Sequence, residues 1–335
     1  MIRRRILTAL AIVMVAVNCL VGTAWVGSAN AAQTATVTGD ALKVSPVRWD
    51  ISMDPGTTKV VDLFIQNLTS VPVTLHPAIN DFTASDDESG KPNVILDEEA
   101  YAPSHSFKRF AQPLKDLTVQ PKEQRNIKLI VKVPAGAAGG GYYGAVRFSP
   151  AKGSGDKNVN LAASVGTLIL LRVNGAIKEQ MSVASMDVTQ KGKAGSFFTS
   201  NKDLTLVTRF KNEGNVQVEP FGTVTIKKSN RLLQTISVNE KTPRGAVLPD
   251  SIRKFDNSIT KVGGFGKYTL EGSFGYGTTG QLLTVKKTIY VVPVLFFVLV
   301  ILAVILILFL IFVVPRMIRS YNKRIIQRAS RGRRR

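Results

Sequence analysis

An uncharged stretch near the C-terminus constrains this chain most. Residues 289–314 read IYVVPVLFFVLVILAVILILFLIFVV and contain no charged side chain. At about 1.5 Å of rise per residue, a helix of this length crosses a hydrocarbon core about 30 Å thick with some tilt. A buried helix of a soluble protein would show a polar face over such a length, and this one shows none. The sequence therefore predicts a single transmembrane helix over residues 289–314.

A basic tail, residues 315–335, comes after this stretch. It contains nine Arg or Lys side chains and no acid. The positive-inside rule therefore predicts that the tail is cytoplasmic. It also accounts for much of the formal net charge of +21, so we expect no nucleic-acid partner. Basic side chains at this position attract anionic lipid headgroups, and the residues expected to do so are Arg316, Arg319, Lys323 and Arg324.

The N-terminal residues 1–31 have the pattern of a secretory signal peptide. Three arginines precede an apolar run, and Ala29 and Ala31 form a small-x-small cleavage pattern. The alternative is an uncleaved N-terminal anchor, and either one exports the residues after it. The only cysteine, Cys19, lies in the apolar run, so a processed chain has no disulfide and no thiol chemistry. Exported domains without cysteine are more typical of bacteria. We expect a single-pass bacterial membrane protein with extracellular N-terminal domains.

The exported part alternates with the period of β-strands. Between residues 126 and 134, Ile127, Leu129 and Val131 share one face while lysines occupy the other. Further strand patterns cover residues 61–65, 71–75, 167–173, 204–210, 223–228 and 268–274. Many short strands separated by Pro and Gly turns predict an all-β chain with two tandem immunoglobulin-like β-sandwiches before the helix.

The expected sandwiches span residues 40–176 and 177–288. Two segments, FIQNLTSVPVTLHP (64–77) and RFKNEGNVQVEPFG (209–222), repeat the order of strand, Asn, short turn and strand. This echo predicts two related halves. The polar segment 151–160 could be a linker, but we interpret it as a hairpin loop within the first sandwich.

A cluster of three glycines, Gly139, Gly140 and Gly141, precedes one of the strand patterns. A phosphate-binding glycine loop opens a helix, whereas the residues after Gly141 alternate as a strand does. The cluster is therefore interpreted as a strand-entry turn with Tyr142 in the core. In an alternative interpretation, Tyr143 and Arg147 share the outer face and bind sugar rings or a partner protein.

No residue set in the chain predicts catalysis. His76 and His105 lack acids at a spacing that would form a triad. The acidic run Asp86, Asp87 and Glu88 lacks the ligand spacing of an EF-hand and is interpreted as a solvated loop, with a weak calcium site as the alternative. We expect no enzyme, cofactor, metal site or small-molecule substrate. A hydrolase stays possible only if two carboxylates converge in a cleft.

The order of these features resembles the WxL-interacting protein family. The shared elements are the turn Asp54-Pro55-Gly56, the strand ending in Asn67, Pro121, Val133-Pro134, and Gly140-Gly141. The resemblance implies a first domain that binds peptidoglycan and a second that engages surface ligands of a Gram-positive cell. The opening of the first sandwich also resembles bacterial immunoglobulin-like chaperone domains, whose edge strands accept another chain's strand.

Together these features predict a membrane-anchored cell-surface binding or adhesion protein. Its expected partner is a cell-wall polymer, peptidoglycan or teichoic acid, or a surface protein that it ties to the membrane. The alternative is a strand-accepting chaperone or an accessory subunit of a membrane or secretion complex, which requires an unprotected edge strand.

Overall fold

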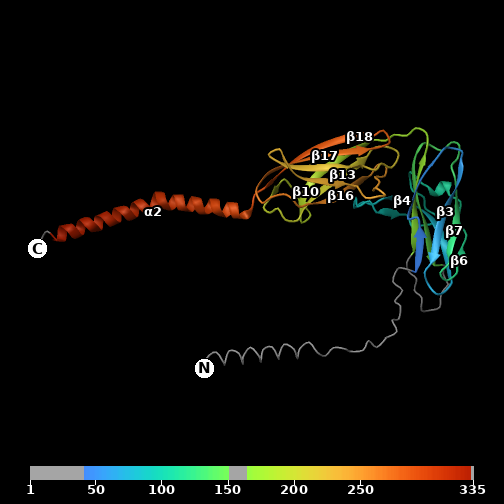
Figure 1. Cartoon of the computed structure of the whole chain (residues 1–335), viewed down its shortest axis with the longest axis horizontal. Coiled ribbons are helices and arrows are strands. Elements are labelled where there is room, and N and C mark those ends of the chain that lie inside the picture. Colours follow the sequence, from blue (N-terminus) through green and yellow to red (C-terminus); the bar gives the residue numbers. More distant parts are fainter. Residues whose placement is uncertain (1–40, 151–163, 333–335) are drawn as a thin grey trace, which may run out of the picture. The chain divides into compact units, whose positions relative to one another are not determined.

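Residues 41–150 and 164–332 are described by a computed structural model (Figure 1), in which they belong to one compact unit. The predicted signal peptide and Cys19 lie outside the described residues, as does the polar segment 151–160. Strands dominate up to residue 291, and one long helix comes after them. The predicted fold class, two immunoglobulin-like β-sandwiches and a C-terminal helix that could span a membrane, is confirmed.

The first sandwich packs two sheets against each other. One sheet has the order β1-β3-β7, with strands β1 (Leu42–Ser45), β3 (Thr58–Asn67) and β7 (Gln124–Lys132). The other has the order β2-β9-β8-β4-β5, with β2 (Arg48–Met53), β9 (Val165–Val173), β8 (Gly140–Pro150), β4 (Val73–Ala84) and β5 (Pro92–Val94), and with β6 (Leu117–Val119) also paired to β4. The chain crosses between the sheets at Pro46, and β2 then runs parallel to β9.

Side-chain alternation explains the first core. Leu129 and Val131 of β7 are fully buried, as are Ile169 and Leu171 of β9. Leu170 points away from this core and is buried in a second cluster on the opposite face of its sheet. Residues 167–173 therefore form an almost continuous apolar run because β9 is covered on both faces.

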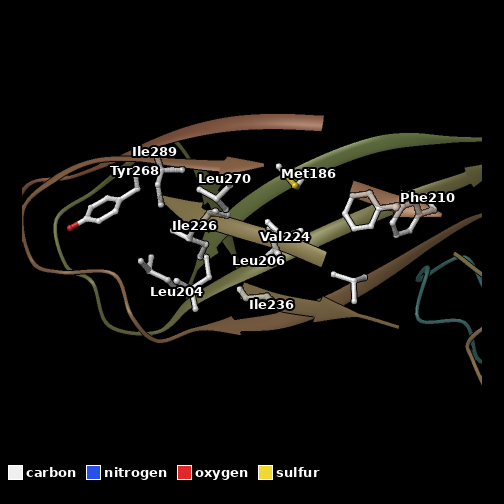
Figure 2. Close-up of a cluster of buried hydrophobic side chains, with 14 of the residues drawn as sticks. Met186, Leu204, Leu206, Phe210, Val224, Ile226, Ile236, Tyr268, Leu270 and Ile289 are labelled. Carbon is white, nitrogen blue, oxygen red and sulfur yellow. The ribbon is translucent and has the colours of Figure 1, made fainter. Parts of the chain in front are cut away.

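The second sandwich has the same general arrangement. One sheet has the order β11-β10-β13-β16, with β10 (Met181–Gln190), β11 (Lys193–Gly195), β13 (Leu204–Asn212) and β16 (Ile252–Ile259). The other has the order β12-β18-β17-β14-β15, with β12 (Phe197–Phe198), β14 (Phe221–Lys228), β15 (Arg231–Val238), β17 (Gly266–Tyr276) and β18 (Gln281–Val291). Figure 2 shows the core between them, where Tyr268, Ile289 and Leu204 lie at one end and Phe210 at the other.

Two buried asparagines occupy equivalent places at the ends of β3 and β13. Asn67 donates hydrogen bonds to the carbonyl oxygens of Val71 and Val119, at 2.7 and 3.1 Å. Asn212 donates to those of Val216 and Val247, at 2.7 and 2.8 Å. Each side chain thus binds the turn after its strand, which gives the repeat in the sequence a structural basis.

The predicted start of the membrane helix at residue 289 is wrong. Ile289 and Val291 are buried side chains of β18, and helix α2 runs from Val294 to Gly332 after Pro293. An apolar strand end and an apolar helix start look alike in a sequence, and only the pairing of β18 with β17 separates them. By length and composition, Val294–Arg319 could span a membrane. Arg316 and Arg319 lie at the end of this segment.

Helix α2 continues into the basic tail. Lys323 and Arg324, which we expect to contact lipid headgroups, belong to α2, and their side chains lie outside the described residues.

A candidate binding groove beside the junction of the sandwiches

The glycine cluster lies where β8 meets the second sandwich. The Gly141 N–H donates a hydrogen bond to the carbonyl oxygen of Asn215, at 2.7 Å. A Cβ atom on Gly139 would lie 2.7 Å from the amide nitrogen of Ala176, and one on Gly141 would overlap the hydroxyl of Tyr143. The glycines therefore do open a strand, as predicted. They also leave room for the backbone of the next sandwich and of residues 174–180, which connect β9 to β10 and are called the linker below.

Asn215 joins three parts of the chain at this junction. Its side-chain Nδ2 donates to the carbonyl oxygens of Gly139 and Ala176, at 3.0 and 2.8 Å. Its Oδ1 accepts a hydrogen bond from the amide of Lys178, at 2.7 Å. One side chain thus binds the entrance of β8, the linker and the second sandwich, a role that no local sequence pattern indicates.

The prediction that Tyr143 is an exposed binding residue is wrong. It lies on the face of β8 opposite the core residues Val146 and Phe148, as the alternation implies, but only 2% of it is exposed. The segment containing His105 and residues of the second sandwich cover it, and its hydroxyl donates to Gln217 Oε1 at 3.0 Å. Burial raises the pKa of this hydroxyl.

Arg147 does not form a shared ligand-binding surface with Tyr143. Its guanidinium donates to Asn80 Oδ1 at 3.4 Å and lies 4.0 Å from Glu98. The neighbouring Tyr142 is partly buried and packs against the core, with its ring 4.7 Å from that of Phe110. The alternation of side chains along β8 thus correctly predicts which residues share a face. It does not show that other parts of the chain cover the face opposite the core.

The side chains of the acidic run form hydrogen bonds within their own turn and an ion pair with the second sandwich. Asp87 accepts hydrogen bonds from Ser85 and Ser89, which lower its pKa. Glu88 forms an ion pair with Arg209 at 2.6 Å, and Asp86 is exposed. In the part of the chain that the structure describes, no group of three or more His, Cys, Asp or Glu side chains could hold a metal ion.

His76 lies between the carboxylates of Asp116 and Glu98, two residues that are distant from it in the sequence. Its Nδ1 is 2.7 Å from Asp116 and its Nε2 is 3.3 Å from Glu98. The hydrogen bond with Asp116, followed by that with Glu98, raises the pKa of the imidazole. The ring is almost half exposed, and both its nitrogens contact acids, so no nitrogen is left to serve a nucleophile as in a triad.

A groove of about 680 Å³ opens beside the junction, with walls from both sandwiches. Its lining includes Asp50, Arg172, Glu179, Gln217, Glu219, Phe221, Arg244 and Thr278. At its rim, Arg48 Nη2 donates to Asp50 at 2.6 Å and to Glu219 at 2.5 Å. The groove therefore has charges of both signs, supplied by segments far apart in the sequence.

An aromatic platform forms one side of the groove. The guanidinium of Arg244 lies 4.0 Å above the ring of Phe221, which is 39% exposed. The cation–π contact holds the guanidinium on the ring, and exposed aromatic and Arg side chains are residue types enriched at protein interfaces. Arg48 supports this pair by donating to the carbonyl oxygen of Arg244 at 2.9 Å.

Strand β2 brings a sheet edge to the groove. It is the last strand in the order of its sheet and pairs with β9 on one side. Ile51 and Met53 are buried, whereas Asp50 and Ser52 are exposed. On its outer side no strand of the described residues pairs with it, so backbone groups are available to an added strand.

Glu179 links the linker to the second sandwich at the floor of the groove. It accepts hydrogen bonds from the Thr278 amide at 2.6 Å and from Arg172 Nη1 at 2.7 Å. Burial alone would raise its pKa, but these hydrogen bonds outweigh burial and hold the pKa below its usual value.

This lowered pKa predicts that the junction loosens in acid. A depressed carboxyl pKa stabilises the folded state at pH above the unfolded value, about 4.3, and the stabilisation is lost as the pH falls through the folded value. The melting temperature of the wild-type chain should therefore fall over this range by more than that of Glu179→Gln. Glu240→Gln, an exposed glutamate without an ion pair in the described chain, is the matched control. Equal pH slopes for wild type and Glu179→Gln would contradict the assignment.

Comparison with known proteins finds a likeness in structure only. No family model and no curated protein matches the chain. Among solved structures, the class 5 fimbriae chaperone CfaA is 9% identical, over 75% of this chain and 99% of its own, with a TM-score of 0.38. The YadV chaperone is 12% identical, over 74% and 100%, with a TM-score of 0.33. The CupB2 chaperone of Pseudomonas aeruginosa is 14% identical, over 73% and 99%, with a TM-score of 0.32. Likeness at this level carries no information on what this chain binds.

Proposed function

We propose that this chain is a membrane-anchored, non-catalytic binding protein that holds an extended segment of a partner protein in the groove beside its junction. The observation that carries the proposal is the combination of an open sheet edge, β2, with the Phe221–Arg244 platform in one groove. The backbone of an added strand would bind the edge, and the platform would receive its side chains.

The balanced charge of the groove favours a protein segment over an anionic wall polymer. The three carboxylates of Asp50, Glu179 and Glu219 are matched by the guanidiniums of Arg48, Arg172 and Arg244. The groove therefore has no excess positive charge to attract teichoic acid phosphates. A peptide has charges of both signs and backbone donors and acceptors, which match this lining. The wall-tethering function that the resemblance to WxL-interacting proteins implies is the competing candidate.

Binding also fits the carboxylates better than hydrolysis does. Glycoside hydrolysis requires one carboxyl group to donate a proton to the leaving group. Asp50 and Glu219 instead accept hydrogen bonds from the same nitrogen of Arg48. We therefore propose that these acids position Arg48 and the groove wall.

Site-specific photocrosslinking in intact cells tests this function. A photoreactive phenylalanine analogue at position 221 should yield a product with a protein partner, and Arg244→Glu should reduce its amount. The matched control is the same analogue at Phe64, an exposed position in β3 outside the groove. A product that peptidoglycan hydrolases release and proteases leave unchanged would establish the wall polymer instead. Equal crosslinking from positions 64 and 221 would contradict the groove as the site.

A further inference from the structure

One end of the second sandwich is tied closely to helix α2. Strand β18 ends at Val291, and α2 begins at Val294, so two residues separate the sandwich from the membrane segment. The pairings Gly266 with Val291 and Leu204 with Ile259 place the loops that precede β17 and β13 at this same end. We call the segments 190–204, 227–232 and 258–268, with the end of β18, the helix-proximal end.

The helix-proximal end is strongly basic. Its exposed cations are Lys191, Lys193, Lys202, Lys228, Arg231, Lys261 and Lys267, and its one acid is Asp203. The structure shows none of these cations in an ion pair with any residue it describes, although Lys228 donates to the carbonyl oxygen of Phe265. The partly buried Lys227, at the border of this end, pairs with Glu271, and cations elsewhere in the sandwich also have acidic partners, for example Lys286 with Glu271 and Lys287 with Asp187.

The opposite end of the same sandwich has a different charge. There, the five acids Glu179, Glu213, Glu219, Glu240 and Asp250 are balanced by five bases, Lys178, Lys211, Lys241, Arg244 and Arg253. The positive charge is therefore concentrated at one end of the sandwich, and that end is the one connected to α2. General basicity of the chain does not account for this asymmetry.

Exposed aromatic side chains accompany the cations. Phe197 is 74% exposed and stacks on Tyr290, with ring centroids 4.9 Å apart. Phe265 is 52% exposed, and its ring lies 5.3 Å from that of Phe296 in the first turn of α2. Aromatic rings combined with unpaired lysines are the composition that binds the interface between lipid headgroups and acyl chains.

We propose that the helix-proximal end binds the anionic lipid headgroups of the leaflet from which α2 emerges. The inference rests on the membrane anchoring in the proposed function. The lysines would contact lipid phosphates, and Phe197 and Phe265 would enter the interface between them. The two-residue connection holds this surface at the bilayer, and the contact would hold the groove at a defined height above the membrane.

Reconstitution of the full chain in lipid nanodiscs tests the proposal. With Cys19→Ser as background, an environment-sensitive dye on Thr199→Cys reports on the helix-proximal end. Its emission should shift to the blue in discs that contain phosphatidylglycerol, relative to discs of phosphatidylcholine alone. High salt should remove the shift. So should the combined substitution Lys193→Glu, Lys202→Glu, Lys261→Glu and Lys267→Glu.

A matched charge reversal separates local contact from net charge. The control is Lys43→Glu, Lys59→Glu, Lys132→Glu and Lys241→Glu, all exposed lysines outside the helix-proximal end, and it should retain the blue shift. Equal emission in the two lipid mixtures, or equal loss in both variants, would overturn the proposal. If the chain fails to float with the discs at all, the membrane anchoring itself is wrong and the inference falls with it. Photocrosslinking at position 221 does not depend on the lipid and tests the groove separately.

Discussion

Replacing Asn212 by alanine should lower the stability of the second sandwich by about 4 kcal/mol, because each buried polar group left unpaired costs about 1–3 kcal/mol. The substitution leaves two buried groups without a partner, the carbonyl oxygen of Val216 and the amide of Gly214, while the carbonyl oxygen of Val247 loses one donor and keeps the amide of Val218. For a domain of this size, the melting temperature should fall by roughly 15 °C or more. Scanning calorimetry of the detergent-solubilised chain measures this change.

Three variants show whether the hydrogen bonds cause the loss. Asn212→Asp keeps the size but removes the donors, so it should destabilise at least as much as alanine. Asn67→Ala should have a similar effect on the first sandwich, where Asn67 makes the equivalent contacts. Asn126→Ala removes one exposed hydrogen bond to Asp62 and should change stability by about 0.5 kcal/mol or less. A melting temperature for Asn212→Ala close to that of wild type would contradict the assigned role.

Replacing Gly139 by alanine should open the junction between the sandwiches. The added Cβ would lie 2.7 Å from the amide nitrogen of Ala176 and 2.9 Å from the carbonyl carbon of Gly175, both rigid backbone atoms. The backbone must therefore move, which weakens the hydrogen bonds of Asn215 to this region and costs about 1–3 kcal/mol. Trypsin should cleave the linker at Lys178 about tenfold faster or more, since 1.4 kcal/mol corresponds to a tenfold change.

The same loop provides the control for this prediction. A Cβ on Gly136 would have no atom within 4 Å, so Gly136→Ala should leave the rate of cleavage unchanged. The two variants make the same chemical change three residues apart, and only one of them meets the linker. Identical cleavage rates for Gly139→Ala and wild type would show that the glycine cluster is only a strand-entry turn.

Local sequence patterns were enough to predict the strands, the repeated halves and the long apolar helix. Alternation in residues 127–133 predicts β7, and the continuous run in 167–173 predicts a strand covered on both faces, β9. These features are local, because a period of two and the absence of charge are properties of a few neighbouring residues. The Asn shared by the two repeats likewise predicts equivalent turns. Asn67 and Asn212 each donate a hydrogen bond to a carbonyl oxygen of the turn that follows.

What covers each strand face, and where the groove lies, depends on contacts that exist only in the folded chain. Alternation placed Tyr143 opposite the core, yet the second sandwich buries it against Gln217. Arg48 and Glu219 meet at 2.5 Å although 171 positions separate them, and no spacing rule joins such residues. The last residues of β18 are as apolar as a membrane helix, and only their pairing with β17 shows that they form a strand. In each case the deciding contact is between segments distant in sequence, and side-chain period carries no information about such contacts.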